Sequence, residues 1–289
     1  MVETHRSVLG TDDVTVVVVT RNRRRRLAET LRSLRHLPER PPVVVVDNDS
    51  SDGTAEEAAR AGVTVIRAPS NRGAAGRTLG VEAARTPYVA FCDDDSSWAP
   101  GSLSRSAARF RATPRLGLLA ARVLVEPGSR EDPVCTALAA GPPSPAGPRV
   151  LGFLACGAVV RRSAYLAVGG FHPRFGIGGE EDLLALDLTA AGWWCCYAPD
   201  LVACHAPART ERAGRRRREV RNALWTAWLR RRPAGLVHRT LGVISDGWRD
   251  RDTWAGVGSA VAGAPWVLAE RRRVDPATEA LRAFADGLS

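Results

Sequence analysis

Three consecutive aspartates, Asp93, Asp94 and Asp95, directly follow a run of strand-forming and apolar residues at 88–92. Adjacent carboxylates repel one another, so crowding them does not stabilise a fold unless a counter-charge is present. A divalent cation such as Mg²⁺ or Mn²⁺ supplies that charge and commonly keeps open coordination positions for substrate phosphates. The structural alternative is a solvated acidic turn or a helix N-cap. The choice between the two depends on what the rest of the chain places beside the aspartates.

A second acidic group, Glu180, Glu181 and Asp182, opens a segment with a helical pattern that runs to residue 191. Acidic side chains in a first helical turn interact favourably with the helix dipole, which is a sufficient structural explanation for this trio. Asp187 lies farther along the same segment, and we expect it to face solvent.

The elements that must position these groups begin with four apolar runs that alternate with helical patterns. The runs cover residues 14–19, 43–46, 63–67 and 88–91. Strands that alternate with helices predict an α/β fold with a mostly parallel central sheet and helices on both faces. Ligands of such sheets bind beyond the carboxyl ends of the strands. Thr20, Asp47 and the aspartate cluster all lie at such ends.

The second half of the chain is expected to extend this sheet and to add a basic helical tail. We expect strands at residues 116–125, 150–160, 193–197 and 201–205, a flexible Pro- and Gly-rich excursion at 126–149, and a helix at 215–229.

The chain of 289 residues carries a formal net charge of +10, supplied by arginine alone because lysine is absent. Arginine clusters suit phosphate-bearing ligands or an anionic membrane surface. No nucleic-acid-binding motif accompanies the charge, so no nucleic-acid partner is expected.

The six cysteines show no CxxC spacing and are interpreted as small core residues. No secretory signal or membrane span is recognisable, which predicts a cytoplasmic protein. The Arg- and Trp-rich tail is a candidate for peripheral contact with the anionic inner face of the membrane.

The order of these motifs resembles the family 2 inverting glycosyltransferases. The likeness covers residues 14–232 and includes the Val-rich strand with its VDNDSSDGT continuation, Asn-Arg-Gly, the aspartate cluster, Gly-Gly-Phe, Glu-Glu-Asp and a late histidine. Each motif alone is weak evidence, whereas the combination is specific. The resemblance implies the GT-A nucleotide-diphospho-sugar transferase fold with a basic helical C-terminal tail. It also implies a catalytic domain at 1–210, with a nucleotide-sugar part at about 12–112 and an acceptor part at about 113–210. A helical extension at 211–289 would pack on this domain.

The same resemblance assigns a set of residues to the nucleotide-sugar. They are Thr20, Arg21, Asn22, Asp47, Asn48, Arg72, Gly73, Asp93 and Asp94. Asp47 stands where the family's aspartate accepts a hydrogen bond from a pyrimidine N3–H, with an Asx turn as the structural alternative. Thr20 and Asn22 have helix capping as their alternative role, and Arg72 has that of a solvated loop arginine. The chain departs from the family pattern at Arg77 and Thr78, where an asparagine commonly precedes Leu-Gly.

The metal and the catalytic base are likewise implied by the resemblance. Asp95 is expected to bind Mg²⁺ or Mn²⁺ directly, Asp93 to contact the ribose or the metal, and His205 to be either a third ligand or a structural histidine. The ion would neutralise the charge that grows on the departing diphosphate. Glu181 aligns with the family's catalytic aspartate, and Asp182 replaces it after a one-residue shift. Either would act as general base toward the acceptor hydroxyl.

The sequence therefore predicts a metal-dependent inverting glycosyltransferase that uses a UDP- or dTDP-sugar. Its acceptor hydroxyl would belong to a cell-surface glycan, a lipid-linked glycan or a natural product. The alternative is a non-catalytic membrane-surface or scaffolding protein on a degenerate transferase fold, although carboxylates are retained in both acidic groups. A dinucleotide-dependent dehydrogenase is excluded because the glycines at residues 73–76 lack the GxGxxG spacing and do not follow the first strand.

Overall fold

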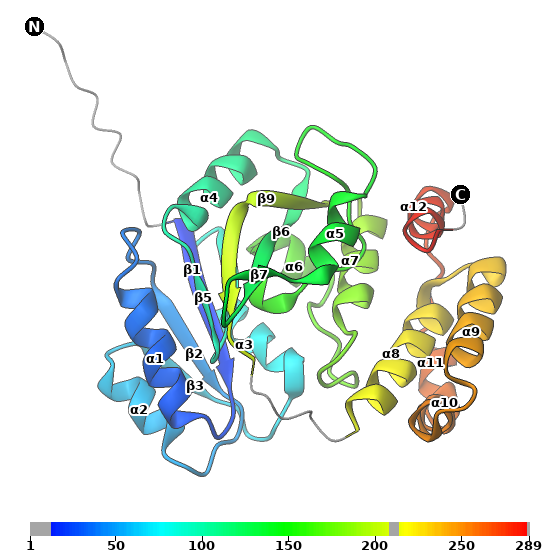
Figure 1. Cartoon of the computed structure of the whole chain (residues 1–289), viewed down its shortest axis with the longest axis horizontal. Coiled ribbons are helices and arrows are strands. Elements are labelled where there is room, and N and C mark those ends of the chain that lie inside the picture. The colour runs from blue at the N-terminus through cyan, green and yellow to red at the C-terminus, as the bar shows by residue number, and fades with distance from the viewer. Residues whose placement is uncertain (1–12, 208–213, 288–289) are drawn as a thin grey trace, which may run out of the picture.

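The computed structural model describes residues 13–207 and 214–287, and a nine-stranded sheet forms its centre (Figure 1). The strand order is β3-β2-β1-β4-β8-β6-β9-β5, and β7 pairs with β6. The strands are β1 Val14–Thr20, β2 Val43–Asp47, β3 Thr64–Arg67, β4 Tyr88–Asp93, β5 Ser96–Trp98, β6 Leu116–Val125, β7 Arg130–Glu131, β8 Ala158–Arg161 and β9 Trp194–His205.

Most of the strands run in one direction, as the alternation of strands and helices predicts. Strands β1 to β4 are mutually parallel, and β8 is antiparallel to both β4 and β6. Strand β6 therefore runs with β4 again, and β9 is parallel to β6. The register sets Thr20 opposite Asp47 and Val19 opposite Asp93. The polar ends of three neighbouring strands consequently meet at one edge of the sheet.

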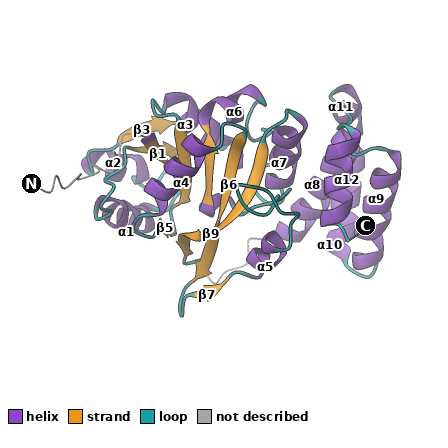
Figure 2. Cartoon of the chain, turned by 90° about the horizontal axis from the view of Figure 1, so that it is seen from above, coloured by secondary structure: helices purple, strands orange, loops and turns teal. Residues whose placement is uncertain are grey.

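Helices cover both faces of the sheet (Figure 2). They are α1 Arg24–Arg35, α2 Thr54–Arg60, α3 Gly76–Ala83, α4 Ser102–Ala112, α5 Pro133–Ala139, α6 Arg162–Ala167, α7 Glu181–Ala190, α8 Arg215–Arg230, α9 Pro233–Gly247, α10 Arg251–Ala262, α11 Ala264–Ala269 and α12 Pro276–Ala285, with short 3₁₀ helices η2 Gly73–Ala75 and η3 Ala155–Gly157. Within the described ranges, no helix combines the length and the apolar character needed to span a bilayer.

The main core explains why the first strand is an unbroken β-branched run. Val16, Val17 and Val18 are completely buried because helices close both faces of the sheet. Helix α1 adds Leu27 and Leu31 from one side of its surface, at the spacing that an amphipathic helix requires. All six cysteines are free, and most of them are buried in this core, as the sequence predicts.

The C-terminal helices α8 to α12 gather beyond α7 at one end of the sheet (Figure 1). They form a smaller apolar core around Val220, Leu224 and Trp225, into which Phe175 and Leu183 also pack. Each such buried side chain contributes about 2 kcal/mol relative to exposure. Because Leu183 belongs to α7, the tail is anchored on the helix that begins with the acidic trio. The expected domain boundary at residues 210 and 211 lies outside the described residues.

Two expected strand assignments are wrong. Residues 150–160 do not form one strand, because only Ala158–Arg161 joins the sheet and η3 precedes it. The apolar run reflects burial rather than strand geometry, and its glycines permit close turns; a Cβ at Gly157 would lie 2.7 Å from Val123 Cγ2. The two short strands expected at 193–197 and 201–205 are a single strand, β9, whose pairing with β6 shifts register between Ala121 and Arg122.

The excursion at residues 126–149 is also more ordered than expected. It contains β7 and helix α5, which begins after Asp132. The Asp132 side chain accepts a hydrogen bond from Val134 N at 3.0 Å, and a proline occupies the start of the helix. Both are standard features of a helix N-terminus, so a local signal for α5 was present in the sequence.

Candidate functional site

A cavity of about 550 Å³ opens at the carboxyl ends of β1, β2 and β4. The loop at residues 173–177 and the first turns of α8 form its opposite wall. Eight of the residues assigned from the sequence line this cavity: Thr20, Arg21, Asn48, Arg72, Gly73, Asp93, Asp94 and Asp95. Asn22, Asp47, Glu181, Asp182 and His205 are not among the lining residues.

Asp94 sits in the tight turn between β4 and β5, where the chain reverses direction. Thr20 Oγ1 donates a hydrogen bond to Asp94 Oδ2 at 2.7 Å, and Thr30 Oγ1 donates to the Asp94 carbonyl at 2.9 Å. Burial, only partly offset by the Thr20 bond, raises the pKa of Asp94 to about 6. Thr20 thus stabilises the turn from the end of β1. The sequence predicts only nucleotide contact or helix capping for this residue.

Asp95 is brought next to His205 by the pairing of β5 with β9, whose register sets Ser96 opposite His205. His205 Nε2 lies 3.4 Å from Asp95 Oδ1, and the Asp95 side chain is buried. The interaction with Asp95 raises the pKa of His205 above its ordinary value, and burial opposes that rise. The late histidine and the last aspartate of the cluster are therefore neighbours.

The donor atoms of Asp95 and His205 fit a divalent ion that arrives with a diphosphate. Among the described residues, no group of three or more His, Cys, Asp or Glu side chains is arranged to hold a metal by itself. Mg²⁺ and Mn²⁺ sites in nucleotide enzymes commonly use one or two carboxylates and complete their coordination with substrate phosphates and water. A carboxylate and an imidazole nitrogen are both suitable ligands for Mn²⁺.

Asp93 forms an ion pair with Arg77, a residue without an assigned role in the sequence reading. The Arg77 side chain is buried, and its guanidinium lies 5.6 Å from the centre of the Phe171 ring. Burial lowers the pKa of Arg77, but the charges of Asp93 and Glu180 outweigh burial and raise it above its ordinary value. Arg77 is thus a fixed cation between the two acidic groups.

Helical spacing in α3 was the signal that could have identified Arg77. The buried positions of α3 are Gly76, Arg77, Gly80 and Val81, which lie on one face at the i, i+3, i+4 spacing. An arginine on the buried face of a helix needs an acidic partner. The departure from the family pattern drew attention to Arg77, but it did not identify Asp93 as the partner.

Asn48 organises the loop at residues 71–73 that borders the cavity. Its Oδ1 accepts a hydrogen bond from Arg72 N at 2.8 Å, and its Nδ2 donates to the Gly73 carbonyl at 3.0 Å. Gly73 has a φ of +57°, and a Cβ there would lie 2.7 Å from Gly176 Cα. Ala74 N also donates to the Gly176 carbonyl at 3.0 Å. Glycine at 73 therefore lets the two cavity walls touch.

Asp47, at the end of β2, is buried with an unused acceptor. Its Oδ2 accepts a long hydrogen bond from Ser50 N at 3.4 Å, whereas Oδ1 has no hydrogen-bond partner among the described residues. Asn22 Oδ1 accepts from Ser51 N at 2.8 Å, which ties the first loop to the second. Arg21 is half-exposed and lies beside Asp49.

The acidic trio spreads its three side chains into different surroundings. Glu180 is buried and accepts a hydrogen bond from Gly178 N. Burial, followed by repulsion from Glu180, raises the pKa of Glu181 well above its ordinary value, and the charge of Arg77 opposes this rise. Asp182 instead lies 3.2 Å from Arg282 of α12.

Asp187 does not face solvent, contrary to expectation. Its Oδ2 accepts a hydrogen bond from Arg230 Nη2 at 3.0 Å, and a second bond joins Oδ1 to Arg230 Nε. The Arg230 side chain is buried between α7 and the tail. The expectation was wrong because the tail covers a helix face that would otherwise be solvated.

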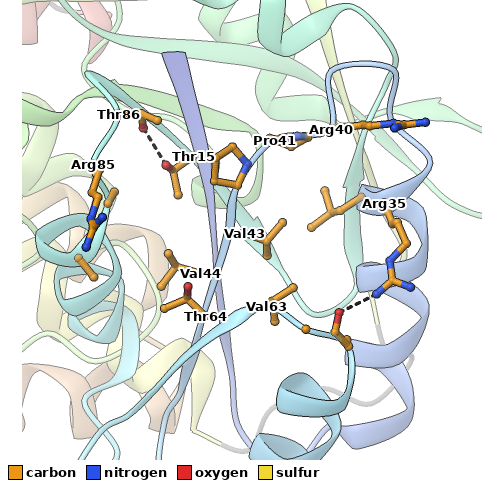
Figure 3. Close-up of a pocket in the computed structure, with 16 residues that line it drawn as sticks. Thr15, Arg35, Arg40, Pro41, Val43, Val44, Val63, Thr64, Arg85 and Thr86 are labelled. Carbon is orange, nitrogen blue, oxygen red and sulfur yellow. Dashed lines mark hydrogen bonds between the residues drawn. The ribbon is translucent and has the colours of Figure 1, made fainter. Parts of the chain in front are cut away.

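A larger cavity of about 1200 Å³ lies at the opposite, amino ends of the parallel strands (Figure 3). Thr15 is hydrogen-bonded to Thr86 at 2.8 Å there, and Arg35 donates to the Ala61 carbonyl at 2.6 Å. Its lining contains arginines and apolar residues but no acidic side chain. It therefore lacks the carboxylates that the cavity at the carboxyl ends presents.

Comparison with known proteins agrees with this geometry. The family described as Glycosyl transferase family 2 matches residues 15–165. A Pre-mycofactocin glycosyltransferase of Mycobacterium tuberculosis is 33% identical over 208 residues, which are 67% of this chain and 42% of that protein. An N-acetylglucosaminyl-diphospho-decaprenol L-rhamnosyltransferase of the same organism is 30% identical over 239 residues, which are 69% of this chain and 78% of that protein. The chain thus spans less than half the length of the first of these relatives.

Solved structures of low sequence identity share the fold. The mannosyltransferase PcManGT from Pyrobaculum calidifontis, in complex with GDP-Man and Mn²⁺, superposes with a TM-score of 0.62 at 20% identity, covering 95% of this chain and 79% of that chain. TarS of S. aureus gives a TM-score of 0.63 at 17% identity, covering 96% of this chain and 53% of that chain.

Proposed function

Because the chain belongs to glycosyl transferase family 2, we propose that its transfer of a sugar from a nucleotide-sugar is a metal-dependent, inverting displacement by an acceptor hydroxyl. The observation that carries this proposal is the cavity in which the ends of β1 and β4, Asn48 and the loop at Arg72 meet the aspartate cluster. It is large enough to hold much of a nucleotide-sugar, and it presents both cations and carboxylates.

We assign the donor to the wall made by the ends of β1 and β2. Asp47 does not itself line the cavity, but it directly precedes Asn48, which does, and its unused Oδ1 supports its role as acceptor for the N3–H of a pyrimidine base, as in a UDP- or dTDP-sugar. Thr20, Arg21 and Asn22 belong to the loop that would border the nucleotide, and Arg72 and Gly73 belong to the facing loop. An arginine guanidinium suits a phosphate as bidentate donor.

We assign the divalent ion, Mg²⁺ or Mn²⁺, to Asp95 and His205, with Asp93 reaching either the ion or the ribose. When bound, the ion stabilises the negative charge that develops on the departing diphosphate. The protein's own contribution is to hold Asp93 through Arg77 and to hold Asp94 through Thr20. These contacts keep the carboxylates in place while the ligand enters.

The general base is assigned to Glu181 rather than to Asp182. Asp182 is engaged in an ion pair with Arg282 of α12, which directs its carboxylate toward the tail. Glu181 has a raised pKa, which brings a carboxylate closer to the value that suits proton transfer near neutral pH. One base is sufficient for a single inverting displacement.

The tail supports a proposal of peripheral contact with an anionic, cytoplasmic membrane face. Trp248, Trp254 and Leu268 are exposed, and the Arg249 guanidinium lies 4.4 Å from the centre of the Trp248 ring. Exposed tryptophan beside arginine is a combination that partitions to the interface of anionic lipids. The acceptor would then be a hydroxyl on a lipid-linked glycan, with a cell-surface glycan or a natural product as the other classes.

The test is calorimetric titration of UDP and of dTDP into the full chain, with and without Mn²⁺. We expect metal-dependent binding of at least one nucleotide, weakened about tenfold or more in Asp95→Ala. Asp246→Ala, which removes an exposed aspartate of α9, is the matched control and should bind as wild type does. Binding that is independent of the metal, or unchanged in Asp95→Ala, would refute the metal assignment.

A further inference from the structure

The cavity carries more positive charge than a nucleotide-sugar alone requires. Seven arginines and three aspartates line it. Two of these arginines, Arg77 and Arg21, already have carboxylate partners, in Asp93 and Asp49. Among the described residues, Arg72, Arg174 and Arg221 form no ion pair with a carboxylate. If the donor diphosphate is neutralised by a divalent ion, the remaining charge is available for a second anion.

Part of this charge stands on the wall opposite the nucleotide. Arg174 comes from the loop at residues 173–177, and Arg218 and Arg221 come from α8. We call these three residues the arginine wall. The Arg174 guanidinium lies 5.2 Å from the centre of the Trp266 ring, which supports it from the tail. Two members of the arginine wall thus come from α8, and the third comes from the loop at residues 173–177 and stacks on Trp266 of α11.

Arg221 is the most firmly oriented member of the arginine wall. Its guanidinium lies 4.3 Å from the centre of the Trp225 ring, Nη2 donates to the Phe175 carbonyl at 2.6 Å, and Nε donates to Asn222 Oδ1 at 3.0 Å. Nη1 makes no hydrogen bond to a described residue. Burial and the nearby charges of Arg218 and Arg217 lower the pKa of Arg221. A lowered pKa is expected for an arginine that has no acidic partner nearby.

The arginine wall adjoins the proposed base and not only the donor. Asn222, next to Arg221 on α8, donates to the Phe175 carbonyl at 3.0 Å and to the Gly178 carbonyl at 2.7 Å. Gly178 N in turn donates to Glu180, directly before Glu181. Glu181 does not line the cavity, but these hydrogen bonds connect α8 to the residue directly before it. Because the acceptor must present its hydroxyl to the base, we place the acceptor on this side.

We propose that the arginine wall binds a phosphate or diphosphate ester carried by the acceptor. This inference rests on the proposed function and adds the chemical class of the second substrate. Planar guanidinium groups bind phosphate oxygens in a bidentate manner, and a group fixed by stacking loses little entropy on binding. The acceptor's phosphate would thereby fix the distance between its hydroxyl and Glu181.

The test is calorimetric titration of phenyl phosphate into the full chain saturated with Mn²⁺ and the nucleoside diphosphate that it binds. Benzyl alcohol and inorganic phosphate are the comparison ligands. We expect phenyl phosphate to bind without displacing the nucleotide, about tenfold more weakly in Arg221→Gln, with partial recovery in Arg221→Lys. Arg174→Gln should also weaken binding, and it leaves the Arg221 bond to Phe175 intact. Arg216→Gln is the control, because Arg216 faces Asp250 and does not line the cavity.

Several results would overturn the inference. They are failure of phenyl phosphate to bind the nucleotide-saturated chain, displacement of the nucleotide by phenyl phosphate, and unchanged binding in both Arg221→Gln and Arg174→Gln. Binding of inorganic phosphate or benzyl alcohol as tightly as the ester would equally exclude an acceptor ester. Donor hydrolysis by the wild type is measured in parallel. Hydrolysis without phosphate binding refutes this inference alone, whereas absence of both nucleotide binding and hydrolysis refutes the proposed function and the inference with it.

Discussion

At the scale of single residues, Arg77 links the two acidic groups of the site. It pairs with Asp93 on one side, and its charge acts on Glu180 and Glu181 on the other. Without this cation, three buried or half-buried carboxylates would face one another uncompensated. The charge balance of the site therefore depends on a residue of α3 that need not touch the substrate.

The Glu180→Gln variant tests the electrostatic coupling to the proposed base. The negative charge of Glu180 raises the pKa of Glu181, so a neutral glutamine should lower that pKa. A base must be ionised to act, and activity is lost as pH falls through its pKa. The acid limb of the pH profile of kcat/KM for donor hydrolysis should consequently move to lower pH, by roughly one unit. Glu82→Gln, at an exposed position of α3, should leave the profile in place. A shift to higher pH would contradict the assignment.

The Arg77→Met variant tests the buried ion pair as a structural element. Arg77 is buried but the Asp93 side chain is 32% exposed, so water screens part of the charge left behind, and we expect the free energy of unfolding to fall by about 1–3 kcal/mol. Urea unfolding at neutral pH measures this loss. Arg60→Met removes an exposed arginine that pairs with Glu57, and its effect should stay within about 0.5 kcal/mol. Equal stability of the two variants would show that Arg77 is not a structural cation.

The sequence identified the residues at the strand ends better than it identified their partners. Asp93, Asp94 and Asp95 were recognisable because three adjacent carboxylates are unusual after a buried strand. Their contacts to Arg77, Thr20 and His205 depend on strand register and helix orientation, which one sequence does not encode in any local pattern. For this reason the sequence alone left open whether Thr20 caps a helix and whether His205 is a metal ligand or a structural histidine.

At the scale of elements, helix α12 holds the first turn of α7. Arg282 of α12 lies 3.2 Å from Asp182, and it donates from Nη1 to the Leu151 carbonyl at 3.1 Å and from Nε to Asp286 at 3.0 Å. The position of Glu181, one residue before Asp182, is thereby tied to the C-terminal end of the described chain.

The Arg282→Gln variant tests whether this contact positions the base. We expect kcat for donor hydrolysis to fall several-fold with little change in donor KM, because the donor wall is untouched. In the double variant Arg282→Gln/Asp182→Asn, the loss of kcat should be smaller than the two single losses combined, because both substitutions remove the same contact. Arg273→Gln, an exposed neighbour on the same tail, is the control. Full additivity, or an effect on KM alone, would argue against a positioning role.

The strands were predictable where both faces are buried and unpredictable where the chain bends. In the valine runs of β1 and β2 every residue except Val43 is buried, as expected for central strands that helices cover on both faces. The run at residues 150–160 is also largely apolar, but most of it is irregular, and η3 within it contacts β4, β6 and β9. The bulge in β9 was hidden for the same reason, since hydrophobicity reports burial and not hydrogen bonding.

At the scale of the whole molecule, positive charge and exposed apolar side chains are concentrated in the C-terminal helices. Burial of Leu183 and Phe175 joins these helices to the sheet, so they are positioned relative to the cavity. Trp254 lies on α10, and Trp248 directly follows α9; the sequence predicted a helical, Arg- and Trp-rich tail but not the bounds of these two helices. The sequence did not show which of these tryptophans are exposed, because their exposure depends on how α8 to α11 pack.

The doubly substituted Trp248→Ala and Trp254→Ala variant tests the proposed membrane contact. Both tryptophans are exposed, so their removal should leave the unfolding midpoint nearly unchanged. Co-sedimentation with vesicles containing anionic phospholipid should fall about fivefold or more, because interfacial tryptophan contributes strongly to partitioning. Val134→Ala on α5 is the control. Equal sedimentation of all variants, or no preference for anionic over neutral vesicles, would exclude this surface.

Turnover of a nucleotide-sugar by the full chain shows whether this protein carries out a metal-dependent, inverting transfer. A panel of UDP- and dTDP-sugars is incubated with Mg²⁺, and early products are followed by nuclear magnetic resonance. We predict that at least one donor releases its nucleoside diphosphate together with a sugar of the opposite anomeric configuration, and that chelation of the metal or Glu181→Gln abolishes the reaction. Turnover with retained configuration would exclude an inverting mechanism, and turnover undiminished in Glu181→Gln would exclude Glu181 as the base.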